Sequence, residues 1–216
     1  MKKTKINYNF LLAFAFLGAC ASPHRVEPNI TPMSETHSLV GADEKILKAQ
    51  PSGHYKSEAS HTSLIWRVGH LGLSNYTARL NKISADLDFN SAEPEKSSVV
   101  AQIDPLSVAT GIESFDKEIG EKIFENKPIV FKSTKLIPIG ATKAKMIGDL
   151  EFHGATKPVE LIVTFNGGTI YPFSTKHAIG FSAHGYFKRS DFGVTQYIPL
   201  VSDEVEIFIE VEFIKK

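Results

Sequence analysis

Several features that would point to a common class of protein are missing from this chain of 216 residues. Its single cysteine, Cys20, excludes a disulfide within the chain. A formal net charge of zero, from 24 basic and 24 acidic residues, predicts no nucleic-acid partner. The Gly-x-Ser-x-Gly motif of hydrolases and the Gly-rich phosphate loop of kinases are both missing. We therefore predict that the protein is not an enzyme and has no cofactor.

The sequence contains eight histidines, and histidine is a common metal ligand. The histidines in its globular part include His61, His70, His153, His177 and His184. None belongs to a His-x-x-x-His pair, and no set of cysteines accompanies them. We predict no metal site. For His61 and His70, a structural, hydrogen-bonded role is the favoured interpretation, and ligation is the alternative.

What the sequence has instead is alternation of apolar and polar residues, the pattern of half-buried strands. Alternation throughout predicts an antiparallel sheet with one face in water, and about eight strands close into a lipocalin-like barrel. Phe115, Ile119, Ile123 and Phe124 have helical spacing and predict one short amphipathic helix over 112–124, which would cover an end of the barrel. The alternating runs are 61–70, 78–89, 99–104, 129–136, 144–152, 159–165, 178–187 and 205–213. The predicted fold class is all-β.

The alternation also assigns apolar side chains to the inner face of the barrel. These residues are Leu64, Trp66, Val68, Leu87, Phe89, Val99, Phe131, Leu150, Phe152, Leu161, Val163, Phe165, Phe181, Ala183, Phe187, Ile207, Ile209 and Val211. Alternation says only which residues face inward. A solid core and a hollow barrel both remain open at this point.

Six short segments, in order along the chain, are similar to the motifs of one known family. The segments are 61–74, 107–111, 128–134, 148–161, 188–193 and 203–205. Together they resemble the YceI-like family, small periplasmic proteins that hold a polyisoprenoid lipid inside a lipocalin-like barrel. The similarity covers roughly residues 53–214. The chain departs from the family pattern at 78–80, at 115–127 and at Trp66, where phenylalanine is more common.

The resemblance implies binding, sequestration or transport of a long apolar lipid, a polyprenyl lipid or a quinone, without catalysis. The expected lipid-binding residues are the inner set above without Leu87, Val99, Ala183 and Val211. His70 and Arg189 are expected at the mouth of the pocket, where polar groups would meet the lipid head group. For Arg189, pairing with a carboxylate or capping strand-end carbonyls is the alternative. Family members often pair, so the resemblance also suggests a homodimer.

The N-terminus has the pattern of a targeting segment. A basic start, Met1 to Lys5, precedes an apolar run at 10–16 that is shorter than the roughly 20 residues of a membrane-spanning helix. Residues 17–20, Leu-Gly-Ala-Cys, resemble a lipoprotein cleavage box. We predict a lipoprotein signal peptide over 1–19 and acylation of Cys20, with palmitate among its acyl groups. An ordinary secretory signal is the alternative.

Residues 20–52 contain several prolines and little apolar periodicity, so they are interpreted as a flexible tether. Within this tether, 43–49 is either a short helix or a solvated part of the linker. The barrel domain is placed at 53–216. The predicted location is the bacterial cell envelope, with the protein anchored by its lipid and facing the periplasm, and Ala21 favours the outer membrane.

Two other functions fit the same sequence. One is a structural or interaction lipoprotein whose barrel is packed solid and binds no lipid. The other is an enzyme that acts on a lipid-like substrate, which would need a cluster of polar groups inside the barrel.

Overall fold

The computed structural model describes residues 42–172 and 174–216. The predicted signal peptide, Cys20 and most of the predicted tether lie outside these residues. Within the described part of the chain, no helix combines the length and the apolar character needed to cross a membrane.

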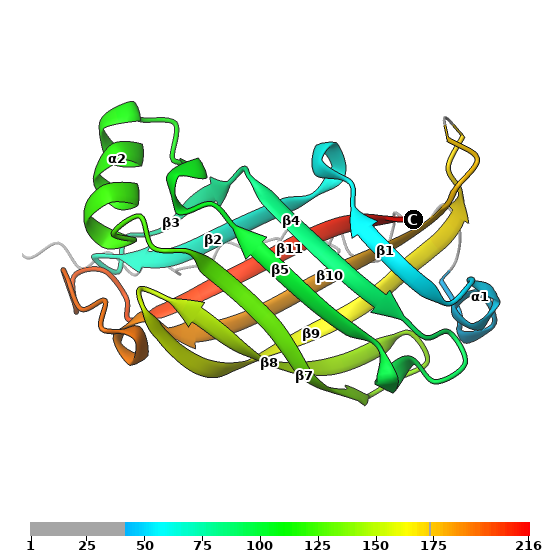
Figure 1. The fold of residues 1–216 in the computed structure, drawn as a ribbon. Helices are drawn as coiled ribbons and strands as arrows, with labels where there is room; N and C mark the ends of the chain where they lie inside the picture. Colours follow the sequence, from blue (N-terminus) through cyan, green and yellow to red (C-terminus); the bar gives the residue numbers. More distant parts are fainter. Residues whose placement is uncertain (1–41, 173) are drawn as a thin grey trace, which may run out of the picture. The chain divides into compact units, whose positions relative to one another are not determined.

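The described residues form one antiparallel sheet that closes on itself (Figure 1). The strand order is β1-β4-β5-β7-β8-β9-β10-β11-β2-β3-β6, and pairing of β1 with β11 closes the barrel. The strands are β1 (Gly53–Ser57), β2 (Ser63–His70), β3 (Ser74–Leu80), β4 (Ile83–Phe89), β5 (Ser98–Ile103), β6 (Val108–Ala109), β7 (Ile129–Pro138), β8 (Lys143–Phe152), β9 (Ala155–Ile170), β10 (His177–Lys188) and β11 (Glu204–Lys215).

Three of the eight barrel strands are each broken into two segments. β1 continues as β2 and β3 as β4, and the two segments of each lie between the same neighbouring strands. β5 continues as β6, which among the described strands pairs only with β3. Short 3₁₀ turns make two of the breaks, where Glu58 and Asp104 accept hydrogen bonds from backbone amides. The predicted eight-stranded antiparallel barrel is therefore confirmed. The sequence analysis missed β1 and β6, which are short segments of five and two residues.

The β8–β9 hairpin shows how local sequence sets the register of the barrel. Its turn consists of His153 and Gly154, whose φ angles are 52° and 80°, and Phe152 pairs with Ala155 across it. Two consecutive residues with positive φ match the twist of a tight hairpin, and glycine adopts this conformation without steric cost. The alternating runs 144–152 and 159–165 are thus the two strands of one hairpin, and β9 begins at Ala155, earlier than its run.

One end of the barrel is covered by the predicted amphipathic helix (Figure 1). Helix α2 (Glu113–Glu118) runs directly into a π-helical turn, Ile119–Ile123. Ile119 and Ile123 pack against the buried cluster at this end of the barrel. We call this the α2 end. It also carries the loop 189–203 that joins β10 to β11.

The other end lies beside helix α1 (Glu44–Ala49), so part of the predicted flexible tether is a packed element. Asp43 caps the helix by accepting a hydrogen bond from the Ile46 amide at 2.6 Å. Leu47 is buried, and the side chain of Gln50 covers Gly168 on β9. Of the two alternatives for 43–49, the structure therefore has the short helix, and this part of the predicted tether packs on the barrel. We call this the α1 end.

Candidate functional site

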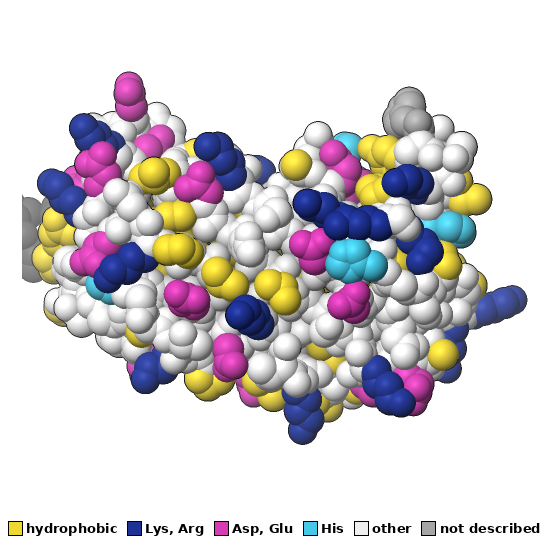
Figure 2. Space-filling model, viewed as in Figure 1, with side chains coloured by type: hydrophobic (Ala, Val, Ile, Leu, Met, Phe, Trp, Pro, Cys, Tyr) yellow, Lys and Arg dark blue, Asp and Glu magenta, His cyan; other side chains and the backbone are white. Residues whose placement is uncertain are grey.

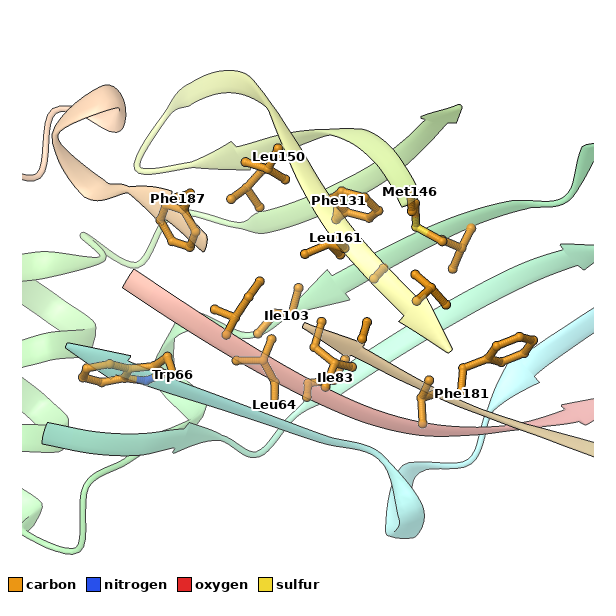
Figure 3. Close-up of a pocket in the computed structure, with 18 of the residues that line it drawn as sticks. Leu64, Trp66, Ile83, Ile103, Phe131, Met146, Leu150, Leu161, Phe181 and Phe187 are labelled. Carbon is orange, nitrogen blue, oxygen red and sulfur yellow. The ribbon is translucent and has the colours of Figure 1, made fainter. Parts of the chain in front are cut away.

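The barrel encloses a cavity of about 1230 Å³. Its wall is almost entirely aliphatic and aromatic, and it extends from Trp66 and Phe187 at the α2 end to Phe181 toward the α1 end (Figure 3). Pockets for drug-sized ligands have volumes of roughly 300–1,000 Å³, so this cavity is large. Apolar cavities do not hold water well, since water needs polar partners. The space is therefore suited to a long apolar ligand.

Every inward-facing residue assigned from the sequence lies in the wall of this cavity, and His70 and Arg189 also line it. Val205 and the alternate residues after it on β11 line the cavity, while Glu204, Glu210 and Glu212 on the same strand do not. The structure thus brings the expected lipid-binding residues together around one space. Their contact with a lipid stays a prediction.

The sequence analysis missed another part of the wall. These residues include Tyr76, Leu80, Ile83, Ala85, Ile103, Ile129, Met146 and Val194. Ile83 and Ala85 alternate with Leu87 and Phe89 on β4, so the period of two could have found them. Tyr76, Ala78 and Leu80 alternate with Thr77 and Arg79 on β3, so the same period of two could have found Tyr76.

Two glycines shape the wall by leaving room for neighbouring side chains. A Cβ atom at Gly148 would collide with the ring of Phe131, and a Cβ at Gly185 would collide with Leu161 and with the backbone of β9. Both glycines follow the inward alternation of their strands, so they let a bulky neighbour lie flat against the sheet. A side chain at either position would push Phe131 or Leu161 into the cavity.

Arg189 is buried in the loop at the α2 end, and its guanidinium donates hydrogen bonds to backbone carbonyls of the same loop. Nε donates to Ser202 O at 2.9 Å, Nη1 to Gln196 O at 2.7 Å and Val194 O at 3.3 Å, and Nη2 to Val201 O at 3.0 Å. These carbonyls belong to the loop that returns the chain to β11. The geometry therefore matches the carbonyl-capping alternative, and the role in head-group contact stays a prediction.

His70 ends β2 at the rim of the cavity, where its side chain is exposed. Its backbone forms an isolated β-bridge with Val201, and Leu71 N donates to Leu200 O at 2.7 Å. The β2–β3 turn and the loop 189–203 are therefore joined at this rim. His70 lies where the predicted pocket-mouth role requires it.

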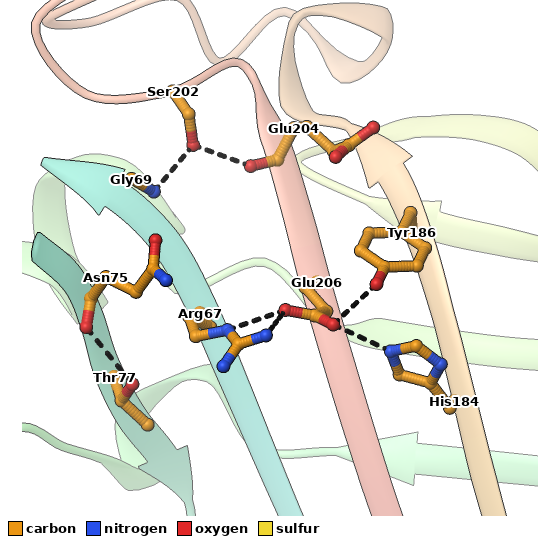
Figure 4. A network of polar contacts seen from close by, with 9 residues as sticks. All are labelled: Arg67, Gly69, Asn75, Thr77, His184, Tyr186, Ser202, Glu204 and Glu206. Carbon is orange, nitrogen blue, oxygen red and sulfur yellow. Dashed lines mark hydrogen bonds and ion pairs between the residues drawn. The ribbon is translucent and has the colours of Figure 1, made fainter. Parts of the chain in front are cut away.

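The outer face of the barrel carries the most extensive polar network (Figure 4). Glu206 on β11 forms an ion pair with Arg67 on β2 and accepts hydrogen bonds from Tyr186 at 2.6 Å and from His184 at 2.8 Å on β10. Burial by itself would raise the pKa of Glu206, but these hydrogen bonds outweigh it and lower the pKa. The network joins three neighbouring strands, and none of its side chains lines the cavity.

The rest of the surface is mixed in charge. On the face shown in Figure 2, basic and acidic side chains are scattered among each other, and hydrophobic side chains form small separate groups. Within the described residues, no group of three or more His, Cys, Asp and Glu side chains is placed to hold a metal ion. The cavity is therefore the feature of the described structure that most clearly suggests a ligand.

Two polar atoms in this apolar wall have no partner. The indole N–H of Trp66 and the hydroxyl of Tyr76 are both buried, and neither makes a hydrogen bond among the described residues. The two rings are neighbours, with centroids 6.1 Å apart. Buried polar groups are nearly always hydrogen-bonded in native proteins, so both atoms need an explanation.

The fold and the cavity define a hollow antiparallel β-barrel with an apolar interior. The model of the YceI-like domain matches residues 55–213. The chain belongs to the YceI-like family.

Curated relatives are similar over most of their length. The chain is 30% identical to a UPF0312 protein of Pseudomonas fluorescens over 190 residues, which are 86% of this chain and 93% of the relative. It is 29% identical to a UPF0312 protein of Vibrio cholerae, over 74% of this chain and 85% of the relative.

Solved structures share the fold. The YceI protein of Campylobacter jejuni is 32% identical, with a TM-score of 0.61, over 68% of this chain and 90% of that one. BcnA of Burkholderia cenocepacia is 22% identical, with a TM-score of 0.65, over 72% and 98%. A polyisoprenoid binding domain from Saccharophagus degradans is 14% identical, with a TM-score of 0.54, over 77% and 100%.

Proposed function

We propose that this protein binds a long apolar lipid of the isoprenoid type, a polyprenyl lipid or a quinone, and sequesters or carries it without chemical change. The observation that carries the proposal is the 1230 Å³ cavity with its apolar wall. Each methylene moved from water into such a wall contributes roughly 0.8 kcal/mol, so a long chain binds well with few polar contacts. The polyisoprenoid binding of the Saccharophagus domain, which has the same fold, supports the choice of ligand class.

The two alternatives explain the interior less well. A structural lipoprotein with a packed barrel does not account for a cavity of this size. An enzyme acting on a lipid would need polar groups that can exchange protons or attack a bond. The middle of the wall is apolar, and the lining residues that can exchange protons, such as His70, Glu118 and Lys143, come from the ends of strands or from α2. Binding is the activity that the wall supports.

Mass spectrometry of organic extracts tests the proposal on the full-length protein purified from a bacterial envelope. We expect one isoprenoid lipid in roughly equal amount to the protein. Ala183→Trp would fill the cavity from β10 and should lose that lipid. The matched control is Ile162→Trp on the neighbouring strand, because Ile162 is 40% exposed and faces outward. If both variants carry the same lipids as the wild type, the lipid is not in the cavity and the proposal fails.

We further propose that Cys20 is acylated and holds the barrel at the membrane on its periplasmic side, in the outer membrane. One acyl chain gives only marginal attachment, whereas several hold a protein stably. Cys20→Ser should abolish incorporation of labelled palmitate and release the protein from the membrane fraction. Incorporation that persists in Cys20→Ser would exclude this cysteine as the anchor. Pairing of two copies stays a prediction, to be measured by light scattering of the purified protein.

A further inference from the structure

The rim of the cavity at the α2 end is built mainly from two segments that carry little charge. Residues 68–78 and residues 192–202 contain no Asp, Glu, Lys or Arg, and His70 is their only histidine. The two segments are joined, because His70 forms a β-bridge with Val201. In Figure 1 the turn between β2 and β3 and the loop 189–203 lie side by side at this end of the barrel.

Five large apolar side chains on these two segments are exposed. We call them the apolar collar, and its members are Leu71, Leu73, Tyr197, Ile198 and Leu200. Leu73 is the most exposed of them, at 82%. Leu71, Tyr197 and Leu200 also line the cavity, so the collar borders the place where the cavity meets the surface. Phe115 on α2 is likewise exposed and lines the same cavity.

The backbone beneath the collar is held by hydrogen bonds within the protein. Arg189 donates to Gln196 O and Val201 O, on either side of the collar residues of the loop. Leu71 N donates to Leu200 O at 2.7 Å and joins the two parts of the collar. Burying an unpaired backbone carbonyl is costly, so a loop whose carbonyls already have donors is suited to contact with an apolar phase.

The lining at the α1 end has a different character. The exposed charged residues of the lining there include Glu44, Lys48, Glu95 and Lys143. At the α2 end, besides the buried Arg189, the lining contains the exposed His70 and the half-buried Glu118, and the collar adds no charge. Charged side chains are expensive to bring against hydrocarbon. The α2 end is therefore the end of the cavity that is suited to contact with lipid.

We propose that the apolar collar docks on the surface of a lipid bilayer, so that the ligand enters and leaves the cavity at the α2 end. The inference rests on the proposed function, because a lipid of the isoprenoid type is supplied by a membrane. A second copy of the chain on the collar would close the cavity against that supply, whereas a bilayer covers the collar and is itself the source of the ligand. Leucine and tyrosine side chains also suit the interfacial layer of a bilayer.

The proposed anchor permits this orientation. Residues 21–41 separate Cys20 from Ala42, where the described part of the chain begins. A segment of that length spans roughly 75 Å at most, when fully extended. The longest strand of the barrel, β9, has 16 residues and is about 50 Å long. A membrane that holds the anchor is therefore within reach of the α2 end.

The test places a fluorescent probe on the collar of the full-length protein. The introduced thiol of Leu73→Cys is labelled with nitrobenzoxadiazole, and the protein is bound to vesicles of phosphatidylethanolamine and phosphatidylglycerol that contain spin-labelled lipid. The spin label quenches only a probe that enters the bilayer. The matched control is Ile139→Cys, because Ile139 is 53% exposed on the turn between β7 and β8, at the α1 end. Labelling of the wild type is the blank for Cys20.

We expect the probe at Leu73 to lose at least half of its emission and the probe at Ile139 to lose almost none. Leu200→Glu in the labelled Leu73→Cys protein should reduce the quenching about threefold or more, because a carboxylate is costly in the interfacial layer. Ile162→Glu, at an exposed position on the outer face of β9, should leave the quenching unchanged. High salt and vesicles of phosphatidylcholine alone should give the same result, because the collar has no charge to be screened.

Four outcomes would overturn the docking of the collar. They are equal quenching of both probes, quenching of neither, quenching that Leu200→Glu leaves unchanged, and shielding of the Leu73 probe that needs no vesicles and grows with protein concentration. The last would assign the collar to a second copy of the chain. Circular dichroism of each variant shows whether a loss of quenching comes from unfolding.

Mass spectrometry of organic extracts separates this inference from the proposed function. Lipid in the extract together with an unquenched probe at Leu73 would leave the carrier function standing and remove the docking. A quenched probe on a protein whose extract contains no lipid would leave the docking standing and remove the carrier function.

Discussion

The two ends of the barrel each contain a buried tyrosine hydroxyl, and the two hydroxyls differ in their hydrogen bonding. At the α1 end, Tyr55 has no exposed surface, its ring packs edge-on against Phe89 with centroids 6.0 Å apart, and its hydroxyl donates to Pro51 O. At the α2 end, the hydroxyl of Tyr76 has no partner, and neither does the adjacent indole of Trp66. The buried hydroxyl at the α1 end therefore has a partner in the protein, whereas the one at the α2 end has none among the described residues.

Both ends contain clusters of edge-to-face aromatic rings, and the α2 end adds hydrogen bonds within its loop. Around Tyr55 the rings of Phe89, Phe181 and Phe213 form edge-to-face contacts, with Phe181 and Phe213 centroids 6.1 Å apart. At the α2 end the loop 189–203 is held by hydrogen bonds of Arg189 and Asp203. Apolar packing does not depend on direction. The backbone carbonyls of a loop without regular strand pairing, by contrast, need hydrogen-bond donors aimed at them. Stability at the α1 end should therefore depend mainly on packed volume, and stability of the loop at the α2 end should depend on polar groups as well.

The largest effect is expected from Phe213→Ala at the α1 end. Phe213 is 4% exposed, and removing a buried aromatic ring costs about 3–5 kcal/mol of unfolding free energy. Met146→Ala is the control, because the Met146 side chain is half-buried and borders the cavity, so its loss opens less new void. Urea unfolding of both variants measures the difference. Equal losses would mean that Phe213 at the α1 end is no better packed than the half-buried Met146.

A somewhat smaller effect, about 2–4 kcal/mol, is expected for Arg189→Leu, which leaves buried loop carbonyls without donors. Hydrogen exchange should rise over the loop 189–203 first, since that is the segment that Arg189 holds. Arg79→Leu is the matched control at an exposed position of β3 and should stay within about 0.5 kcal/mol of the wild type. A stable, protected loop in Arg189→Leu would rule out the capping role.

A pH dependence should follow from Asp203 in the same loop. Hydrogen bonds from the Ser190 amide at 2.9 Å and from the Ser190 hydroxyl at 2.8 Å lower the pKa of Asp203 below its ordinary value. The folded state therefore favours the carboxylate. This stabilisation is fully present at neutral pH and is lost as pH falls below the ordinary range of aspartate and through the lowered pKa.

Thermal unfolding at a series of acidic pH values, compared between wild type and Asp203→Asn, measures this contribution. The difference in stability between the two should shrink as the pH falls. Asp88→Asn is the control, because the Asp88 side chain is 73% exposed and should leave the pH profile almost unchanged. A constant difference between Asp203→Asn and wild type at every pH would contradict the lowered pKa.

The smallest effects on stability are expected from the two tyrosine variants, which test the comparison of the two barrel ends most directly. Tyr55→Phe removes a satisfied hydrogen bond and should cost about 0.5–1.5 kcal/mol. Tyr76→Phe removes an unpartnered hydroxyl and should leave the unfolding free energy of the lipid-free protein unchanged or slightly higher. If Tyr76→Phe is as destabilising as Tyr55→Phe, the hydroxyl of Tyr76 has a partner without ligand and the contrast between the two ends disappears.

The inward-facing side chains could be predicted because a strand turns each successive side chain to the opposite face of the sheet. Leu161 and Val163 on β9, or Ile207 and Ile209 on β11, needed only this rule to be placed in the cavity wall. Tyr76 and Arg189 show where such reasoning stops. Whether a polar atom finds a partner depends on what the fold brings next to it, and residues far apart in sequence decide that.

The sequence by itself determined the all-β class, the inner face of each long strand and the helix that covers the α2 end, because each depends on a period of two or 3.6 along the chain. Only the tertiary structure decided that the barrel is hollow, that residues 42–52 pack on it, and that two donors in its wall are left without acceptors. Periodicity fixes the direction of a side chain. Volume and hydrogen-bond partners arise only when strands from the whole chain meet around one space.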